Sequence, residues 1–283
     1  MIISKSKENI LLIGLILFFI FRFIFVGISE YISEASLFNE IGQLCSFFLT
    51  VLLIYLFRSD LQIFNIDIFA ILLIVICKLL DSFVIYYWGR PGILGINRWG
   101  GIVIYIVGIT FIVALIMKKN EFAYIGSSHN IQKLLIGIGC GILLSLLYIT
   151  PTYYQYRNYV GIYNLNAEYY ENMLLKIVHQ GGYAASFEEP IFRAFLWGYL
   201  AKKGINAKKI VVIQALIFTA AHYYFVPNMW GSLLINIPII AITFGICVYK
   251  TKSIATSFIA HAIVNGARTE ISTTILAMLC VIK

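Results

Sequence analysis

Long apolar segments separated by short polar stretches run along almost the whole chain. They lie at about residues 10–28, 41–57, 66–88, 101–117, 134–149, 184–201, 210–224, 232–249 and 254–266, with an apolar tail at 271–282. About 20 apolar residues are enough to cross a bilayer as a helix. The pattern therefore predicts an all-α fold, a polytopic transmembrane helix bundle of about eight or nine spans.

The composition supports this interpretation and leaves no room for a soluble domain. Hydrophobic residues make up 61% of the 283 positions and charged residues only 12%, whereas soluble proteins contain about 25% charged residues. We expect one integral membrane domain, in which residues 1–150 supply N-terminal helices and residues 151–283 form the core that carries the chemical motifs.

The basic residues are distributed between the apolar segments instead of forming one basic face. This excludes nucleic acid as the expected partner, although the net charge is +8. With the N-terminus inside, most Lys and Arg residues fall in alternate loops, as the positive-inside rule requires. Those on the expected cytoplasmic side are Lys5, Lys7, Arg58, Lys118, Lys119, Lys133, Lys202, Lys203, Lys208, Lys209, Lys250 and Lys252. We predict a multi-pass protein of the cell membrane, in contact with the lipid bilayer, with a cytoplasmic N-terminus.

A few charged residues lie inside apolar segments, where each needs a partner or a polar cavity. Arg22 lies in the first segment, and we expect it to pack inward or to extend toward the membrane surface, not to act in catalysis. Lys78 and Asp81 are three residues apart on one predicted helix, which favours a local ion pair over a proton relay.

The densest polar cluster is the stretch Ser-Phe-Glu-Glu-Pro-Ile-Phe-Arg, which begins at Ser186. Adjacent helical residues point about 100° apart, so Glu188 and Glu189 cannot face one reaction centre in the same way. Arg193 follows Glu189 by four residues and can pair with it, which leaves Glu188 without an intrahelical partner and free to act as a base. Ser186 is a candidate N-cap and Pro190 fits a first helical turn, so two carboxylates that merely cap a helix are the alternative.

Further polar residues lie on later apolar segments. His222 ends one of them, and His261 and Asn265 are four residues apart on another, so they share a helix face. Together with Glu188, these groups could hold and deprotonate a water molecule and stabilise an oxyanion, as amide hydrolysis requires. A Glu with two His also matches the ligands of catalytic zinc. Neither His is part of an H-E-x-x-H sequence, which excludes a zincin.

Three short motifs follow one another in the chain: E-E-P-I-F-R from Glu188, F-T-A-A-H ending at His222, and H-A-I-V-N from His261 to Asn265. In this order they resemble the EExxxR, FxxxH and HxxxN motifs of the CPBP family, the intramembrane proteases related to CAAX prenyl endopeptidases and to bacteriocin-processing or immunity proteins. The resemblance covers about the last hundred residues.

The resemblance implies that Glu188 is a general base, assisted by His222 in activating water. His261 and Asn265 would bind the oxyanion or a metal, and Glu189 with Arg193 would support the site. If a metal is bound, the expected ion is Zn²⁺ and its ligands are Glu188, His222 and His261. The class of enzyme, metallo- or glutamate-type endopeptidase, stays open.

Two functions are therefore considered. The first is an intramembrane endopeptidase that hydrolyses a peptide bond in a peptide or membrane-associated protein substrate. The alternative is a non-catalytic membrane protein on the same scaffold, which acts in bacteriocin self-immunity or regulates another membrane protein. Loss of Glu188 should abolish the first function and leave the second.

Overall fold

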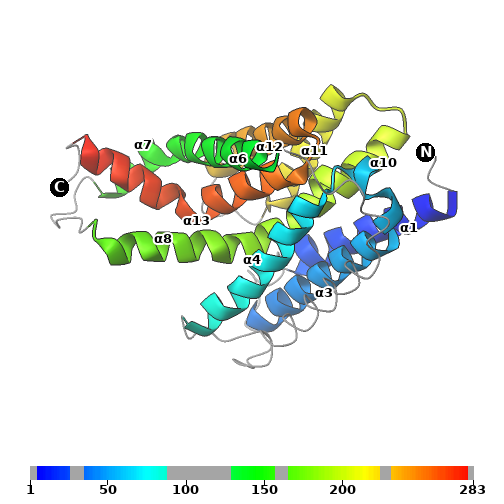
Figure 1. The fold of residues 1–283 in the computed structure, drawn as a ribbon, viewed down its shortest axis with the longest axis horizontal. Helices are drawn as coiled ribbons and strands as arrows, with labels where there is room; N and C mark the ends of the chain where they lie inside the picture. The colour runs from blue at the N-terminus through cyan, green and yellow to red at the C-terminus, as the bar shows by residue number, and fades with distance from the viewer. Residues whose placement is uncertain (1–4, 26–34, 88–128, 157–164, 224–230, 280–283) are drawn as a thin grey trace.

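The computed structural model describes residues 5–25, 35–87, 129–156, 165–223 and 231–279, and within these residues all regular structure is helical (Figure 1). In chain order the helices and helical turns are α1 (Lys5–Phe19), η1 (Ile20–Phe25), α3 (Ala35–Leu56), η2 (Arg58–Phe64), α4 (Ile68–Tyr87), α6 (Asn130–Ser145), η5 (Leu146–Tyr148), α7 (Ile149–Tyr156), α8 (Ala167–Gln180), η6 (Gly181–Ala185), α9 (Ser186–Glu189), η7 (Pro190–Leu196), α10 (Trp197–Lys202), α11 (Ala207–Ala221), η9 (Ser232–Asn236), α12 (Ile237–Thr251) and α13 (Ile254–Met278). The predicted all-α class is confirmed.

Within the described residues, fewer helices meet the criteria for a membrane span than the hydropathy pattern predicts for the whole chain. Among the described residues, three helices are long and apolar enough to cross a membrane: 5–25, 130–154 and 233–251. A fourth is possible if residues 41–56 and 58–64, bent by 102° at their junction, form one span. The eight or nine predicted spans are therefore not confirmed. The predicted span at 101–117 lies outside the described residues.

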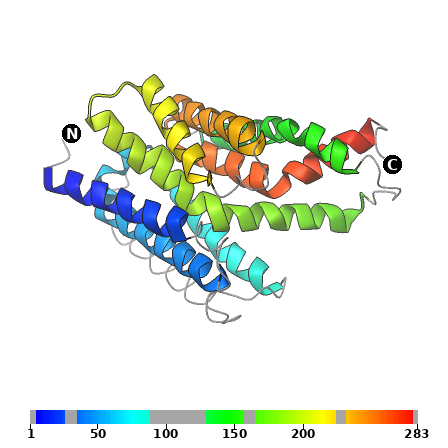
Figure 2. The ribbon, with the colours of Figure 1, turned by 180° about the vertical axis from the view of Figure 1, so that it is seen from behind.

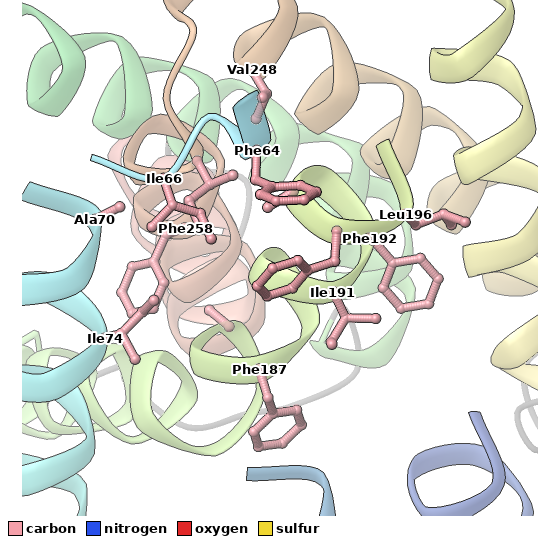
Figure 3. Close-up of a cluster of buried hydrophobic side chains, with 14 of the residues drawn as sticks. Phe64, Ile66, Ala70, Ile74, Phe187, Ile191, Phe192, Leu196, Val248 and Phe258 are labelled. Atoms are coloured by element: carbon pink, nitrogen blue, oxygen red, sulfur yellow. The ribbon is translucent and has the colours of Figure 1, made fainter. Parts of the chain in front are cut away.

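Large apolar side chains lie both on the outside of the bundle and in its centre. Exposed leucines such as Leu135, Leu143 and Leu216 present an apolar exterior of the kind that lipid covers. The centre is rich in phenylalanine, and Figure 3 shows Phe64, Phe187, Phe192 and Phe258 gathered around the segment that contains Glu188. Other members of this cluster come from α1, α3, α4 and α12. Figure 3 labels Ala70 and Ile74 of α4 and Val248 of α12. The most tightly enclosed part of the protein is therefore the segment with the first motif.

Several of the basic segments predicted to be cytoplasmic meet at one end of the bundle. Ion pairs lie there between Lys7 and Asp60 at 2.6 Å, Lys202 and Glu8 at 2.8 Å, and Lys133 and Asp67 at 2.5 Å, and Lys203 also pairs with Glu8. The turn between α12 and α13 joins the same end, because the backbone N–H of Ile254 donates a hydrogen bond to the carbonyl of Asn65. The chain thus collects these basic residues on one side, as the charge pattern predicts, and a cytoplasmic location of that side remains a prediction.

Candidate active site

Glu188 and Glu189 lie in the middle of one long helix. The helical elements from α8 to α10 follow one another without a break from Ala167 to Lys202, and they form the long helix that crosses the whole molecule in Figure 2. Its start is fixed by Asn166, whose side chain accepts a hydrogen bond from the backbone N–H of Tyr169. The two carboxylates are therefore about 30 Å along a continuous helix from its N-terminus.

The prediction that a new helix begins at Ser186 is wrong. The hydroxyl of Ser186 donates a hydrogen bond to the carbonyl of Gly182 at 2.7 Å, within helical backbone, and so caps nothing. Pro190 lies in the helix interior, where its missing N–H removes one backbone hydrogen bond. The helix accommodates it with a wider π-helical turn, η7, of a type that often occurs at functional sites. A purely capping role for the two carboxylates is excluded by this geometry.

Glu188 is paired with a residue from the first helix. Nε and Nη2 of Arg22 both donate to Oε1 of Glu188, at 3.1 and 2.6 Å. Both side chains are buried, with 5% and 2% of their surface exposed. The prediction that Glu188 is unpaired fails because spacing within one helix says nothing about partners on another. The inward packing expected of Arg22 is found, and its target is the candidate base.

Glu189 connects two of the other motif residues. Its Oε1 accepts a hydrogen bond from Nδ1 of His261 at 2.7 Å and lies 3.5 Å from Nη1 of Arg193. The predicted pairing of Glu189 with Arg193 is therefore present. Because a carboxylate only accepts, the His261 ring must carry its proton on Nδ1, and this fixes the orientation of Nε2.

The two adjacent glutamates approach the same imidazole from different sides. Nε2 of His261 lies 3.8 Å from Oε2 of Glu188, the oxygen that Arg22 does not hold. This separation is too long for a direct hydrogen bond. It is short enough for both groups to contact one water molecule. It also allows each group to contact one of two oxygen atoms that are bound to the same carbon.

His222 follows the last residue of α11, and its ring lies close to the aromatic ring of Phe218, which is also near His261. Its Nδ1 is 2.7 Å from the backbone carbonyl of Phe218, which requires that Nδ1 is the donor. The Phe218 ring centre is 4.4 Å from that of His222 and 6.2 Å from that of His261. His222 is also close enough to Glu188 for their charges to interact. The second and third motifs therefore converge on the first.

Arg193 is the largest fully buried side chain among the described residues. Its side chain has no exposed surface, and its guanidinium lies 4.3 Å from the ring centre of Phe218 and 5.3 Å from that of Phe244. The Phe244 ring in turn stacks on His261 at 5.2 Å. Arg193 thus packs behind the imidazole as well as beside Glu189, in an arrangement that favours cation–π attraction.

Asn265 lies one turn after His261 on α13, as its spacing predicts. Its side chain is partly exposed, in contrast to the buried His261. Among the described residues its amide makes no hydrogen bond. It is therefore placed beside the polar cluster by the helix, with donor groups free for another molecule.

The residues proposed as zinc ligands are not arranged as a metal site. One oxygen of Glu188 is held by the Arg22 guanidinium, a cation that would repel a metal ion at that position. Within the described part of the chain, no three or more His, Cys, Asp or Glu side chains are grouped so that they could hold a metal ion. The side chains present do not fit a zinc site in this arrangement.

Comparison with known proteins identifies the family of the motif-bearing region. Residues 171–267 match the family described as Rce1-like, type II CAAX prenyl endopeptidase. This match confirms the predicted resemblance to the CAAX protease family. No curated protein and no solved structure matches the chain. The long apolar helices indicate a membrane protein, and residues 171–267 are similar to CAAX-type proteases.

The region matched to the CAAX protease family covers about a third of the chain and includes all three motifs. Arg22 lies outside it, although it touches Glu188 directly. The sequence offered one sign of its importance, a permanent charge within an apolar segment. Apolar surroundings alone do not distinguish an arginine that contacts a distant site from one that extends to the membrane surface.

A second polar cluster joins α4 to the matched region, residues 171–267. Nζ of Lys78 lies 3.5 Å from Asp81, as predicted, and donates a hydrogen bond to the carbonyl of Gly182 at 2.9 Å. Asp81 also contacts Nδ1 of His179 at 2.6 Å, a partner that the sequence analysis missed because it lies on α8. The cluster joins α4 to the long helix just before the Glu188 segment.

Proposed function

We propose that this protein is an intramembrane endopeptidase that hydrolyses a peptide bond in a peptide or membrane-associated protein. The observation that carries the proposal is the 3.8 Å separation between Oε2 of Glu188 and Nε2 of His261, in a buried site built from the three motifs. The match to a family of CAAX prenyl endopeptidases supports the same reaction type.

Glu188 acts as the general base in this proposal. A water molecule that binds Oε2 gives up a proton to the carboxylate as its oxygen attacks the substrate carbonyl. Nε2 of a neutral His222 accepts the second hydrogen bond of the water, since its Nδ1 proton is directed to the carbonyl of Phe218. Glu188 then transfers the proton to the leaving nitrogen, so that the products are a free carboxylic acid and a free amine.

His261 and Asn265 stabilise the oxyanion. Glu189 accepts a hydrogen bond from Nδ1–H of His261 and so stabilises the imidazolium form, in which Nε2 is also a donor. The Asn265 amide, one turn further along α13, supplies a second donor. Arg193 keeps Glu189 ionised and in place by its charge. Donors fixed before the reaction in a water-poor site are effective at stabilising developing negative charge.

The test is cleavage of a quenched fluorescent peptide that carries a farnesyl group and a C-terminal CAAX sequence, by the purified protein in liposomes. Glu188→Gln should lower kcat by about 10²–10⁴-fold, the contribution of a general base. The variant should still fold, because the Gln carbonyl can accept a hydrogen bond from Arg22. Retention of wild-type kcat by the folded Glu188→Gln protein would refute the proposal.

The same variant separates the enzyme from the non-catalytic alternative. If the protein acts in self-immunity or as a regulator, a protective or regulatory phenotype in cells should persist with Glu188→Gln. If it acts by proteolysis, the phenotype and the cleavage should disappear together.

A further inference from the structure

The first helix, residues 5–25, is joined to the long helix, residues 167–202, by ion pairs at two positions along their length. Arg22 follows Glu8 by 14 residues, and Lys202 follows Glu188 by the same number. Glu8 pairs with Lys202, and Arg22 pairs with Glu188. The first helix therefore runs antiparallel to the long helix and in register with it, which brings Arg22 to Glu188.

The hydrogen bonds that Arg22 donates to Glu188 both go to the same carboxylate oxygen. Both Nε and Nη2 point to Oε1, and Oε2 is the oxygen that faces His261. A carboxylate held at one oxygen cannot rotate freely, so the direction of the other oxygen is fixed. A symmetric pairing of the guanidinium with both oxygens would have left neither free to bind water.

Arg22 is itself held in place. It lies in the π-helical turn η1, and its guanidinium is 5.0 Å from the ring centre of Phe187 and 5.9 Å from that of Tyr183. Both rings belong to the long helix that carries Glu188. A buried, always-charged guanidinium enclosed in this way has little freedom to leave its carboxylate partner.

We propose that Arg22 is a positioning residue of the protease site, which holds Oε1 of Glu188 so that Oε2 faces His261 and the attacking water. This inference rests on the proposed function and extends it to a helix outside the region matched to the family. Arg22 does not contact substrate in this role and acts only through the orientation of Glu188.

The kinetic test compares Arg22→Met, which keeps an unbranched apolar side chain, with Arg22→Lys, which keeps the charge. Arg22→Met should lower kcat on the farnesylated CAAX peptide by about 10²-fold, since small misplacements of a reacting group have effects of that size. KM should stay within about twofold, because binding groups are untouched. Arg22→Lys should recover part of kcat. Wild-type kcat in Arg22→Met, or no recovery in a folded Arg22→Lys protein, would overturn the proposal.

The matched control is Lys133→Met, which removes another inward-facing cation from an ion pair, with Asp67, at the basic end of the bundle. It should leave kcat unchanged. A loss in Lys133→Met equal to that in Arg22→Met would show that any lost ion pair impairs the enzyme, and would refute a specific positioning role.

A second readout does not depend on activity. The infrared bands of the Glu188 carboxylate report whether its two oxygens are in different environments. They are isolated in protein with ¹³C-labelled glutamate, by subtracting the spectrum of Glu188→Gln from that of the parent. They should shift in Arg22→Met and not in Lys133→Met. Unchanged bands would refute the inference.

If the wild type cleaves no peptide but the bands shift, the proposed function fails and the orientation of Glu188 by Arg22 stands. If Arg22→Met does not fold, Arg22→Lys is measured in its place.

Discussion

The ion pairs at the two ends of the contact between the first helix and the long helix lie in different surroundings. Arg22 and Glu188 are buried among aromatic rings, with 5% and 2% of their side-chain surface exposed. At the other end, Glu8 pairs with Lys202 and Lys203, whose side chains are 24% and 50% exposed. Charges in contact with solvent gain little from pairing, whereas a buried charge without its partner is costly. The same helices are thus joined by a buried pair, Arg22 with Glu188, at the candidate site. The pairs of Glu8 lie at the end of the bundle and contribute little.

The largest effect is expected from removal of Arg193, a second buried cation of the candidate site. In Arg193→Met the Glu189 carboxylate stays buried without its positive partner, so the free energy of unfolding should fall by about 3–5 kcal/mol. Reversible unfolding in detergent micelles measures this loss. The double variant Arg193→Met/Glu189→Gln should recover most of it, because no uncompensated charge remains. A double variant as unstable as the single would show that Arg193 stabilises by packing.

The helical class and the motif positions could be predicted from the sequence, whereas the partners across helices could not. Apolar runs and the four-residue spacing of Glu189 with Arg193 report on single helices, and the predicted pair is found. Arg22 contacts Glu188 from 166 positions earlier in the chain, and no periodicity within one helix carries that information.

The wrong helix start at Ser186 has a local cause. Gly181 and Gly182 followed by Ser, Glu, Glu and Pro have the composition of a helix start. In the folded protein, Gly182 is needed for another reason, since a Cβ there would lie 2.6 Å from the carbonyl oxygen of Cys77 and would also overlap Asp81. A glycine that permits close helix packing looks, in sequence, like one that ends a helix.

Gly182→Ala should therefore disrupt the buried region without changing any charge. The added methyl group forces α4 away from the long helix, at a cost of about 1–3 kcal/mol in the free energy of unfolding. The control is Gly139→Ala, where a Cβ meets nothing within 4 Å and where alanine in a helix should be neutral or slightly stabilising. Thermal unfolding of the two variants in the same micelles makes the comparison. Equal stability of both would mean that α4 can shift without loss.

The smallest effect is expected from Glu8→Gln, which removes the exposed counterpart of Glu188 on the first helix. Its partners Lys202 and Lys203 remain hydrated when the carboxylate is lost, so no buried charge is created. The unfolding midpoint should match that of the wild type within error, and any small difference should vanish when the salt concentration is raised, since salt screens exposed charges. The kcat on the farnesylated peptide should also be unchanged. The comparison would be contradicted if Glu8→Gln lowered the free energy of unfolding as much as Arg193→Met does, independently of salt. The register between the two helices would then depend on their exposed end as much as on their buried one.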